Sequence, residues 1–180
     1  AIDQDEQPGR CNIEKIPTLK PAFKKDGTIT AAASSSINDG AAALVLASAA
    51  KAQALGAKPL ARVLAHATHA QSPEWFTTAP VGAIQKVLDK AGWTVDSVDL
   101  FEVNEAFAVV AMAPMRELGI PHAKLNVHGG ACALGHPIGA SGARLLVTLL
   151  NALAQTGGKR GVAALCIGGG EATAVAVELA

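Results

Sequence analysis

The 180-residue sequence contains no tyrosine, and its four phenylalanines and two tryptophans make up only 3% of the chain. Basic and acidic residues number 15 each, so the formal net charge is zero. A nucleic-acid-binding protein usually carries a basic excess or an aromatic RNA-binding motif, and this chain has neither. The longest apolar run, residues 41–50, is followed by Lys51 and is too short to cross a bilayer. The composition therefore argues against a nucleic-acid partner and a membrane segment.

Cysteine is also scarce. Cys11, Cys132 and Cys166 are far apart and lack C-x-x-C spacing, so we expect neither a disulfide framework nor a bound metal. Such thiols are typical of a reducing compartment, and cytoplasm is the default expectation. The sequence starts at Ala1 without methionine and without a charged-then-apolar leader. We therefore expect it to be a piece of a longer protein, so that a missing leader says little about targeting.

Half of the residues are hydrophobic and only 17% are charged, which is typical of a globular chain with a large core. Residues 1–30 are rich in proline, glycine and charge, and loops are predicted there. From residue 59, strand and helix patterns alternate, which indicates an α/β layer fold. For residues 41–48 a buried strand is predicted, with an alanine-rich helix as the alternative. Further strands are predicted at residues 60–66, 98–103, 124–127, 161–166 and 171–179, and helices at 79–91, from 104 onward and at 141–155.

The most informative stretch is a glycine-rich loop at residues 129–142, GGACALGHPIGASG. Glycine is needed at this density where the backbone takes positive φ or lets another group approach closely. His136 precedes Pro137, which restricts it to non-helical backbone. We expect Ser141 to be the N-cap of the next helix, whose N-terminus would favour a developing negative oxygen. Apolar residues nearly surround that helix, so we expect it to be buried on most sides.

Chemically useful side chains occur where the predicted strands pass into loops. Asn104 follows the strand at 98–103, the loop with His136 follows a short strand, and Cys166 ends the strand at 161–166. In α/β sheets, functional groups gather at such strand ends. The three junctions together therefore indicate an active site.

Each of these residues also has a structural interpretation. Cys166 could be a buried packing residue, although burial would raise the pKa of its thiol and suit it to carry a proton. His136 could be a hydrogen-bonded loop histidine, or it could donate to a thioester or ketone oxygen. Asn104 could cap the following helix, or hold a water that completes the same oxyanion site. We expect Glu105 to support the start of that helix.

The motifs around these residues resemble those of the thiolases, the family of acetyl-CoA acetyltransferases and 3-ketoacyl-CoA thiolases. Residues 104–108 (NEAFA), 135–144 (GHPIGASGAR) and 166–170 (CIGGG) are similar to its three C-terminal signatures. Residues 36–43 (SINDGAAA) resemble the segment before the last strand of its N-terminal domain. The resemblance covers nearly the whole chain, and its motifs occur in the family's order.

The resemblance implies a thiolase-like layered α/β fold, in which a mixed sheet carries helices on its faces. This unit would be half of a two-domain αβαβα arrangement. Residues 1–37 would be the end of the loop domain, 38–58 the closing segment of the N-terminal domain, and 59–180 the C-terminal domain.

The implied activity is a two-step acyl transfer that condenses acetyl-CoA to acetoacetyl-CoA or cleaves 3-ketoacyl-CoA with CoA. His136 would activate the nucleophile and, with a water held by Asn104, bind the thioester oxygen. Cys166 would carry the proton of the acetyl methyl group, and the backbone N–H of Gly168 would serve a second oxyanion site. Ser35 matches a serine near the pantetheine arm of CoA. CoA thioesters would be substrates, and no cofactor is expected.

The family's acyl-accepting cysteine belongs to an N-terminal half that this sequence does not include, and Cys11 lies outside any such motif. We therefore expect the chain to need an N-terminal thiolase half and to complete no turnover alone. A homo-oligomer is also expected, because the apolar helix at 141–155 needs cover. The alternative is a non-catalytic half-fold that binds CoA or a partner chain. A decarboxylating condensing enzyme is a second rival, but we would expect it to show a histidine pair.

Overall fold

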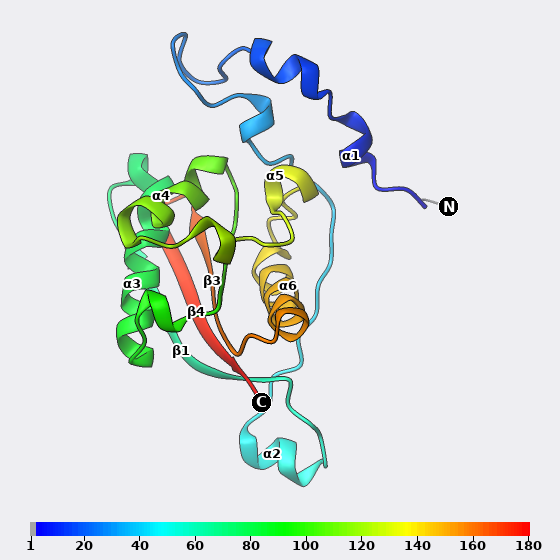
Figure 1. Ribbon diagram of the computed structural model, residues 1–180, viewed down its shortest axis with the longest axis vertical. Coiled ribbons are helices and arrows are strands. Elements are labelled where there is room, and N and C mark those ends of the chain that lie inside the picture. The colour runs from blue at the N-terminus through cyan, green and yellow to red at the C-terminus, as the bar shows by residue number, and fades with distance from the viewer. Residues whose placement is uncertain (1–2) are drawn as a thin grey trace.

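The computed structural model describes residues 3–180, with the exception of the Pro8 side chain (Figure 1). Its elements are short helices before residue 60 and alternating strands and helices after it. In chain order they are α1 (Glu6–Arg10), η1 (Ile13–Thr18), η2 (Ala31–Ala33), α2 (Ala49–Ala54), β1 (Ala61–Ala70), η3 (Pro73–Thr78), α3 (Ala79–Ala91), η4 (Val95–Ser97), β2 (Leu100–Val103), α4 (Ala108–Leu118), η5 (His122–Lys124), α5 (Ala131–Leu134), α6 (Ser141–Thr156), β3 (Arg160–Ile167) and β4 (Glu171–Leu179).

The four strands form one mixed sheet in the order β1-β4-β3-β2. β4 is antiparallel to both of its neighbours, whereas β2 runs parallel to β3. β1 is longer than predicted because it pairs with the whole of β4, from Ala61 opposite Leu179 to Ala70 opposite Glu171. Helices lie on both faces of this sheet (Figure 1), so the predicted fold class is confirmed.

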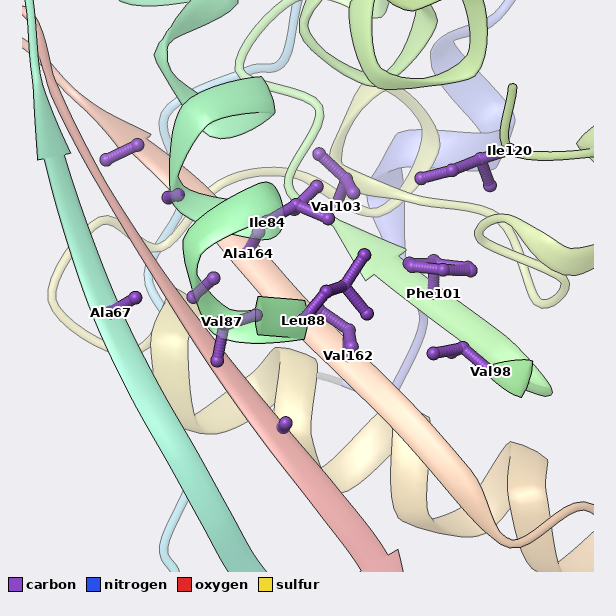
Figure 2. Close-up of a cluster of buried hydrophobic side chains, with 14 of the residues drawn as sticks. Ala67, Ile84, Val87, Leu88, Val98, Phe101, Val103, Ile120, Val162 and Ala164 are labelled. Carbon is purple, nitrogen blue, oxygen red and sulfur yellow. The ribbon is translucent and has the colours of Figure 1, made fainter. Parts of the chain in front are cut away.

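α3 covers one face of the sheet. Its bounds are those predicted, and it ends at Gly92, which adopts the left-handed conformation of a helix C-cap. Its apolar stripe forms a buried cluster with β2 and β3, in which Ile84 lies near Ala164 and Leu88 near Val162 (Figure 2). The 3.6-residue periodicity of the stripe is what makes one side of this helix bind the sheet.

α6 covers the opposite face through Leu145, Leu149 and Leu153, which are spaced four residues apart and fully buried. The predicted helix is therefore present. Val147 and Asn151 on its other side are exposed in this chain, which agrees with the expectation that the helix needs cover from another unit. Only the side that meets β2 and β3 is covered.

Two of the predicted strands are absent from the described residues. Residues 41–48 have no regular structure, and Val45 and Leu46 are 99% and 79% exposed. An apolar run of this kind becomes a strand only where a sheet edge accepts it, and no strand of residues 3–180 pairs with it. Residues 124–127 form a single bridge between Leu125 and Phe101, because Asn126 turns the chain with a φ of 47°.

The N-terminal part of the chain contributes little to the core. The segment up to η2 lies apart from the sheet (Figure 1), and no residue of η1 or η2 is buried. The prediction of loops at residues 1–30 is therefore correct only in part, because the described residues include α1 and η1. Within the described part of the chain, the search for a helix of the length and hydropathy needed to span a membrane found none.

The core beneath α6 gives a first test of the fold. Leu149 lies against Gly161 of β3, where an added Cβ would come within 2.9 Å of its side chain. Leu149→Ala would leave a cavity and is expected to lower the free energy of unfolding by about 2–5 kcal/mol. Urea unfolding followed by circular dichroism measures the loss. Val147→Ala on the exposed side of α6 is the matched control, expected to cost less than about 1 kcal/mol; equal losses would contradict the packing of this face.

Candidate active site

Asn104 and Cys166 are brought to the same edge of the sheet by the parallel pairing of β2 with β3. The last pair in register is Val103 with Ala164, and the Asn104 N–H then donates to the Ala164 carbonyl at 2.9 Å. Cys166 lies two residues beyond Ala164 on β3 and packs against the α3-side cluster. The carboxyl ends of two neighbouring parallel strands thus present an amide and a thiol, as the sequence predicted.

His136 joins Asn104 through its side chain. Asn104 Nδ2 lies 3.3 Å from His136 Nε2, and Ser141 Oγ lies 2.6 Å from His136 Nδ1. The Ser141 hydroxyl donates to the Pro137 carbonyl, so we assign it as the acceptor of an Nδ1–H. Nε2 is then the free base of the ring and accepts from the Asn104 amide. This bond places two of the three predicted site residues in contact.

Two structural interpretations from the sequence are wrong. Ser141 is the first residue of α6 rather than its N-cap, and its fully buried side chain orients His136 instead. Asn104 does not cap a helix, because α4 starts only at Ala108 with Phe107 in the N-cap position. The amide of Asn104 is therefore available to the site, and its buried Oδ1 has no partner among residues 3–180.

The His136 loop is fixed by a segment that lies a hundred residues earlier. The His136 N–H donates to the Ser36 carbonyl at 2.8 Å, and Ile37 forms a parallel bridge to His136. Gly135 has a φ of +91°, and the Asn38 carboxamide occupies the space where its Cβ would be. Sequence reasoning assigned no such role to residues 36–38, since the signal is a contact and not a motif.

Ser35 and Gly168 lie at the rim of this edge. The Ser35 N–H and hydroxyl both donate to the Ala106 carbonyl, at 3.1 and 3.0 Å, which ties the segment to the loop after Asn104. Gly168 is exposed in the turn between β3 and β4. Neither position is joined to His136 by a hydrogen bond in the part of the chain described.

Glu105 holds the glycine-rich loop rather than the start of α4. Its carboxylate accepts from the Cys132 N–H at 3.1 Å and from Asn126 Nδ2 at 2.9 Å, and it fills the space beside Gly130. The Asn126 amide in turn pairs with the N–H and carbonyl of Val103, as a neighbouring strand would. Burial, with the nearby Glu105 carboxylate, raises the pKa of Cys132 to about 11, which leaves that thiol unreactive.

The electrostatics of the two reactive groups are complementary. Burial, reinforced by the charge of Arg144, lowers the pKa of His136, so that its ring is neutral at neutral pH and can accept a proton. Burial raises the pKa of the Cys166 thiol, which therefore keeps its proton. No hydrogen bond within residues 3–180 joins this thiol to His136 or Asn104. The site thus offers a proton acceptor and, on the neighbouring strand, a separate proton carrier.

A buried ion pair lies on the α6 side of β2. Glu102 is 1% exposed, and its Oε2 lies 3.7 Å from Nη1 of Arg144. Burial raises the pKa of Glu102 to about 7, although the Arg144 guanidinium opposes this. Neither residue was predicted to belong to the site; a carboxylate inside the apolar strand Leu100–Val103 was the available signal. Among residues 3–180 no cluster of potential metal ligands is found.

The fold and the site together define an α/β protein with a histidine–asparagine pair and a buried thiol at one sheet edge. Two family descriptions match the chain: "Thiolase, C-terminal domain" over residues 57–179 and "Thiolase, N-terminal domain" over residues 1–50. The chain belongs to the thiolase family, as the resemblance of its motifs indicated.

Individual relatives agree with this assignment. An acetyl-CoA acetyltransferase of Pseudomonas aeruginosa is 53% identical over 175 residues, which cover 97% of this chain and 44% of the relative. The crystal structure of the Bacillus anthracis acetyl-CoA acetyltransferase matches 98% of this chain and 45% of its own, with a TM-score of 0.94 and 43% identity. The Acat5 thiolase from Ascaris suum, solved in complex with coenzyme A, matches 99% of this chain and 47% of its own, with a TM-score of 0.90 and 43% identity. The chain thus spans less than half the length of these relatives.

The Glu105 contacts give a test of how the loop is held. Glu105→Ala would leave the partly buried Cys132 N–H without its acceptor and would remove one of the two acceptors of Asn126 Nδ2. We expect hydrogen exchange of the Cys132 amide to become about tenfold faster or more, since an unsatisfied buried donor costs on the order of 1–3 kcal/mol. Glu117→Ala, at an exposed position of α4, is the control. Unchanged protection of Cys132 would contradict the role given to Glu105.

Glu102 makes the stability dependent on pH. Its pKa is raised from 4.5 to about 7, so the folded protein binds this proton more tightly than the unfolded chain. The contribution of this tighter proton binding to the free energy of unfolding is fully present below about pH 4.5 and is lost as the pH rises through about 7. Glu102→Gln stays neutral throughout, so from about pH 5 to pH 8 the urea midpoint of the wild type should fall relative to that of the variant. A constant difference between the two proteins would disprove this; Glu117→Gln controls for surface charge.

Proposed function

We propose that this chain is the acid–base part of an acetyl-CoA C-acyltransferase that condenses acetyl-CoA to acetoacetyl-CoA or cleaves 3-ketoacyl-CoA with CoA. The observation that carries the proposal is the hydrogen-bonded line from Asn104 through His136 to Ser141, with Cys166 on the neighbouring strand. The printed names of the relatives, acetyl-CoA acetyltransferases and thiolases, support the same activity.

In the first step, His136 Nε2 takes the proton of a cysteine thiol that a thiolase N-terminal half provides. The thiolate forms a bond to the thioester carbon of acetyl-CoA, the bond from that carbon to the CoA sulfur breaks, and the leaving CoA thiolate takes up the proton of the Cys166 thiol. The orientation of His136 by Ser141 supports this role, because an Nδ1–H bound to Ser141 leaves Nε2 free as the base. Once protonated, Nε2–H can donate to the thioester oxygen together with a water held by Asn104.

In the second step, Cys166 acts on the methyl group of the second acetyl-CoA. In the synthetic direction the Cys166 thiolate left by the first step takes a proton from that methyl carbon. The carbon then bonds to the acyl carbon as the bond to the enzyme cysteine breaks, and that cysteine recovers its proton from His136. In the cleavage direction the thiol returns the proton. The raised pKa of Cys166 supports this role, because the thiol then holds its proton between turnovers. The exposed N–H of Gly168, together with the N–H of the nucleophilic cysteine, would bind the oxygen on which negative charge develops.

Coenzyme A thioesters are the substrates in this proposal, and the chemistry requires no cofactor or metal. A thiolase relative was solved with coenzyme A, which supports CoA binding by this chain. Ser35 would meet the pantetheine arm as an acceptor, because its hydroxyl already donates to the Ala106 carbonyl. The proposed partners are the N-terminal half and further copies of the subunit. The free state of the three cysteines fits a reducing compartment such as the cytoplasm.

The proposed activity is tested by joining this chain to a thiolase N-terminal half. We expect residues 1–180 alone to show no thiolysis of acetoacetyl-CoA, and a fusion behind the N-terminal part of the P. aeruginosa relative to show it. In that fusion, Cys166→Ala should lower kcat by about 10²–10⁴, the usual contribution of a general acid–base. Cys132→Ala is the matched control and should keep most of the activity, because its thiol is not used.

The outcomes of this experiment separate the alternatives. Turnover by residues 1–180 alone would show that the nucleophile is not missing. A folded fusion that binds CoA without turnover would favour the non-catalytic half-fold, and activity that survives Cys166→Ala would remove the proposed proton carrier.

A further inference from the structure

The proposed chemistry makes no use of the Glu102–Arg144 ion pair, although both residues are held deep in the fold. Neither oxygen of Glu102 accepts a hydrogen bond and Arg144 Nη2 has no partner, among residues 3–180. At 3.7 Å the two groups attract by charge and not by a hydrogen bond. Desolvation makes such a pair weak evidence for stability, which favours a role at the neighbouring site.

Both partners are adjacent to residues that hold His136. Glu102 lies two residues before Asn104, and alternation along β2 puts both on the same side of the strand. Arg144 follows Ser141 by three residues, one turn along the same side of α6. Arg144 thus extends from the turn that follows Ser141, and its guanidinium lies 3.7 Å from the carboxylate of Glu102, two residues before Asn104. The side chain of Arg144 is only 18% exposed, so water and salt screen its charge weakly.

We propose that Arg144 is a positioning residue whose fixed positive charge keeps the His136 ring neutral. The inference rests on the proposed function, in which His136 must accept a proton from a thiol. A second proton on the ring would place two positive charges near each other in a weakly screened region, which is unfavourable. In agreement with this geometry, burial and then the Arg144 charge lower the pKa of His136.

Other titratable groups also face the His136 loop, one or more from each element packed against it. They are Asp39 from the segment before α2, Glu6 and Arg10 from α1, which contacts α5, Glu102 and Glu105 from β2 and the loop after it, Cys132 within the loop itself, and Cys166 on the strand next to β2. Glu102 titrates near neutrality, so its charge would change during a titration of His136. Glu102→Gln removes this complication and provides a background in which only the charge at position 144 differs.

The experiment is an NMR titration of the His136 ring in this background, with the signal assigned by its loss in His136→Gln. Three proteins are compared: Glu102→Gln, Glu102→Gln/Arg144→Met and Glu102→Gln/Arg144→Lys. Met is similar in length to Arg but uncharged, whereas Lys keeps the charge. We expect the Met variant to titrate about half to one pH unit higher than the background, the size typical of one nearby charge. The Lys variant should stay close to the background.

A purely structural role for Arg144 predicts something else. If loosened packing caused the change, the Lys and Met variants would shift the pKa of His136 by the same amount. If Arg144 had no influence, neither variant would shift that pKa. Either result would overturn the proposal. Amide spectra check that each protein is folded, and Arg144→Gln replaces Met with the same expectation if the Met variant does not fold.

The NMR titration of His136 does not depend on acyl transfer. The proposed acyltransferase function and the proposed role of Arg144 can therefore be rejected independently. A shifted His136 in a protein whose fusion never turns over would reject the proposed function alone. Turnover with an unshifted His136 would reject the role of Arg144 alone. In an active fusion, the acid limb of the kcat/KM profile should move to higher pH with Arg144→Met, in the direction seen by NMR.

Discussion

The parallel pairing of β2 with β3 is the constraint on which the rest of the site depends. It is the one parallel pair among the three strand pairs described. Parallel strands cannot be joined by a tight turn, so the chain from Asn104 to Lys159 must form a long crossover connection, with α4 on the α3 side of the sheet and α6 on the opposite side. That crossover carries α4, the glycine-rich loop and α6. The loop with His136 thereby returns to the edge where β2 and β3 end. Residues that are about 60 positions apart in the sequence, from Asn104 to Cys166, are brought together at that edge.

Polar side chains then hold the crossover in place where regular structure stops. Asn126 pairs with Val103 as a fifth strand would, and Glu105 accepts from the start of α5. The Ser36 carbonyl accepts from His136 in the same way. A glycine-rich loop loses much conformational entropy when it is ordered, so several independent bonds are needed to fix it. These bonds explain how a histidine in such a loop keeps a defined orientation toward Asn104.

Periodicity predicted the elements whose partners lie within the chain. α3 and α6 show a stripe at helical spacing, and β3 and β4 are apolar runs bounded by glycine, so both helices and both strands were found. Prediction failed where a contact decided the outcome. The apolar run at 41–48 has strand composition but no partner strand among the described residues. Ser141 is a residue type typical of an N-cap, but its hydroxyl accepts from the imidazole of His136 instead of capping the helix.

The grouping of Asn104, His136 and Cys166 could be predicted, because each follows a strand and lies in a recognisable motif. Their supports could not. Glu105 and Arg144 lie inside the same motifs, where the sequence shows that they are present but not what they touch. Only the fold shows that one carboxylate holds a loop and another lies 3.7 Å from a guanidinium.

Some of the exposed apolar side chains lie beside the segments that form the site. Ile37 and Ile138 flank the His136 loop and are 85% and 65% exposed, and Val45 follows on the unpaired run. Isolated exposed side chains of this kind are ordinary, but a group around a site marks a surface that another unit covers. The proposed N-terminal half would bring both the missing nucleophile and this cover. Assembly and catalysis would then be coupled, because the contact that buries Ile37 and Ile138 would also exclude water from the His136 base.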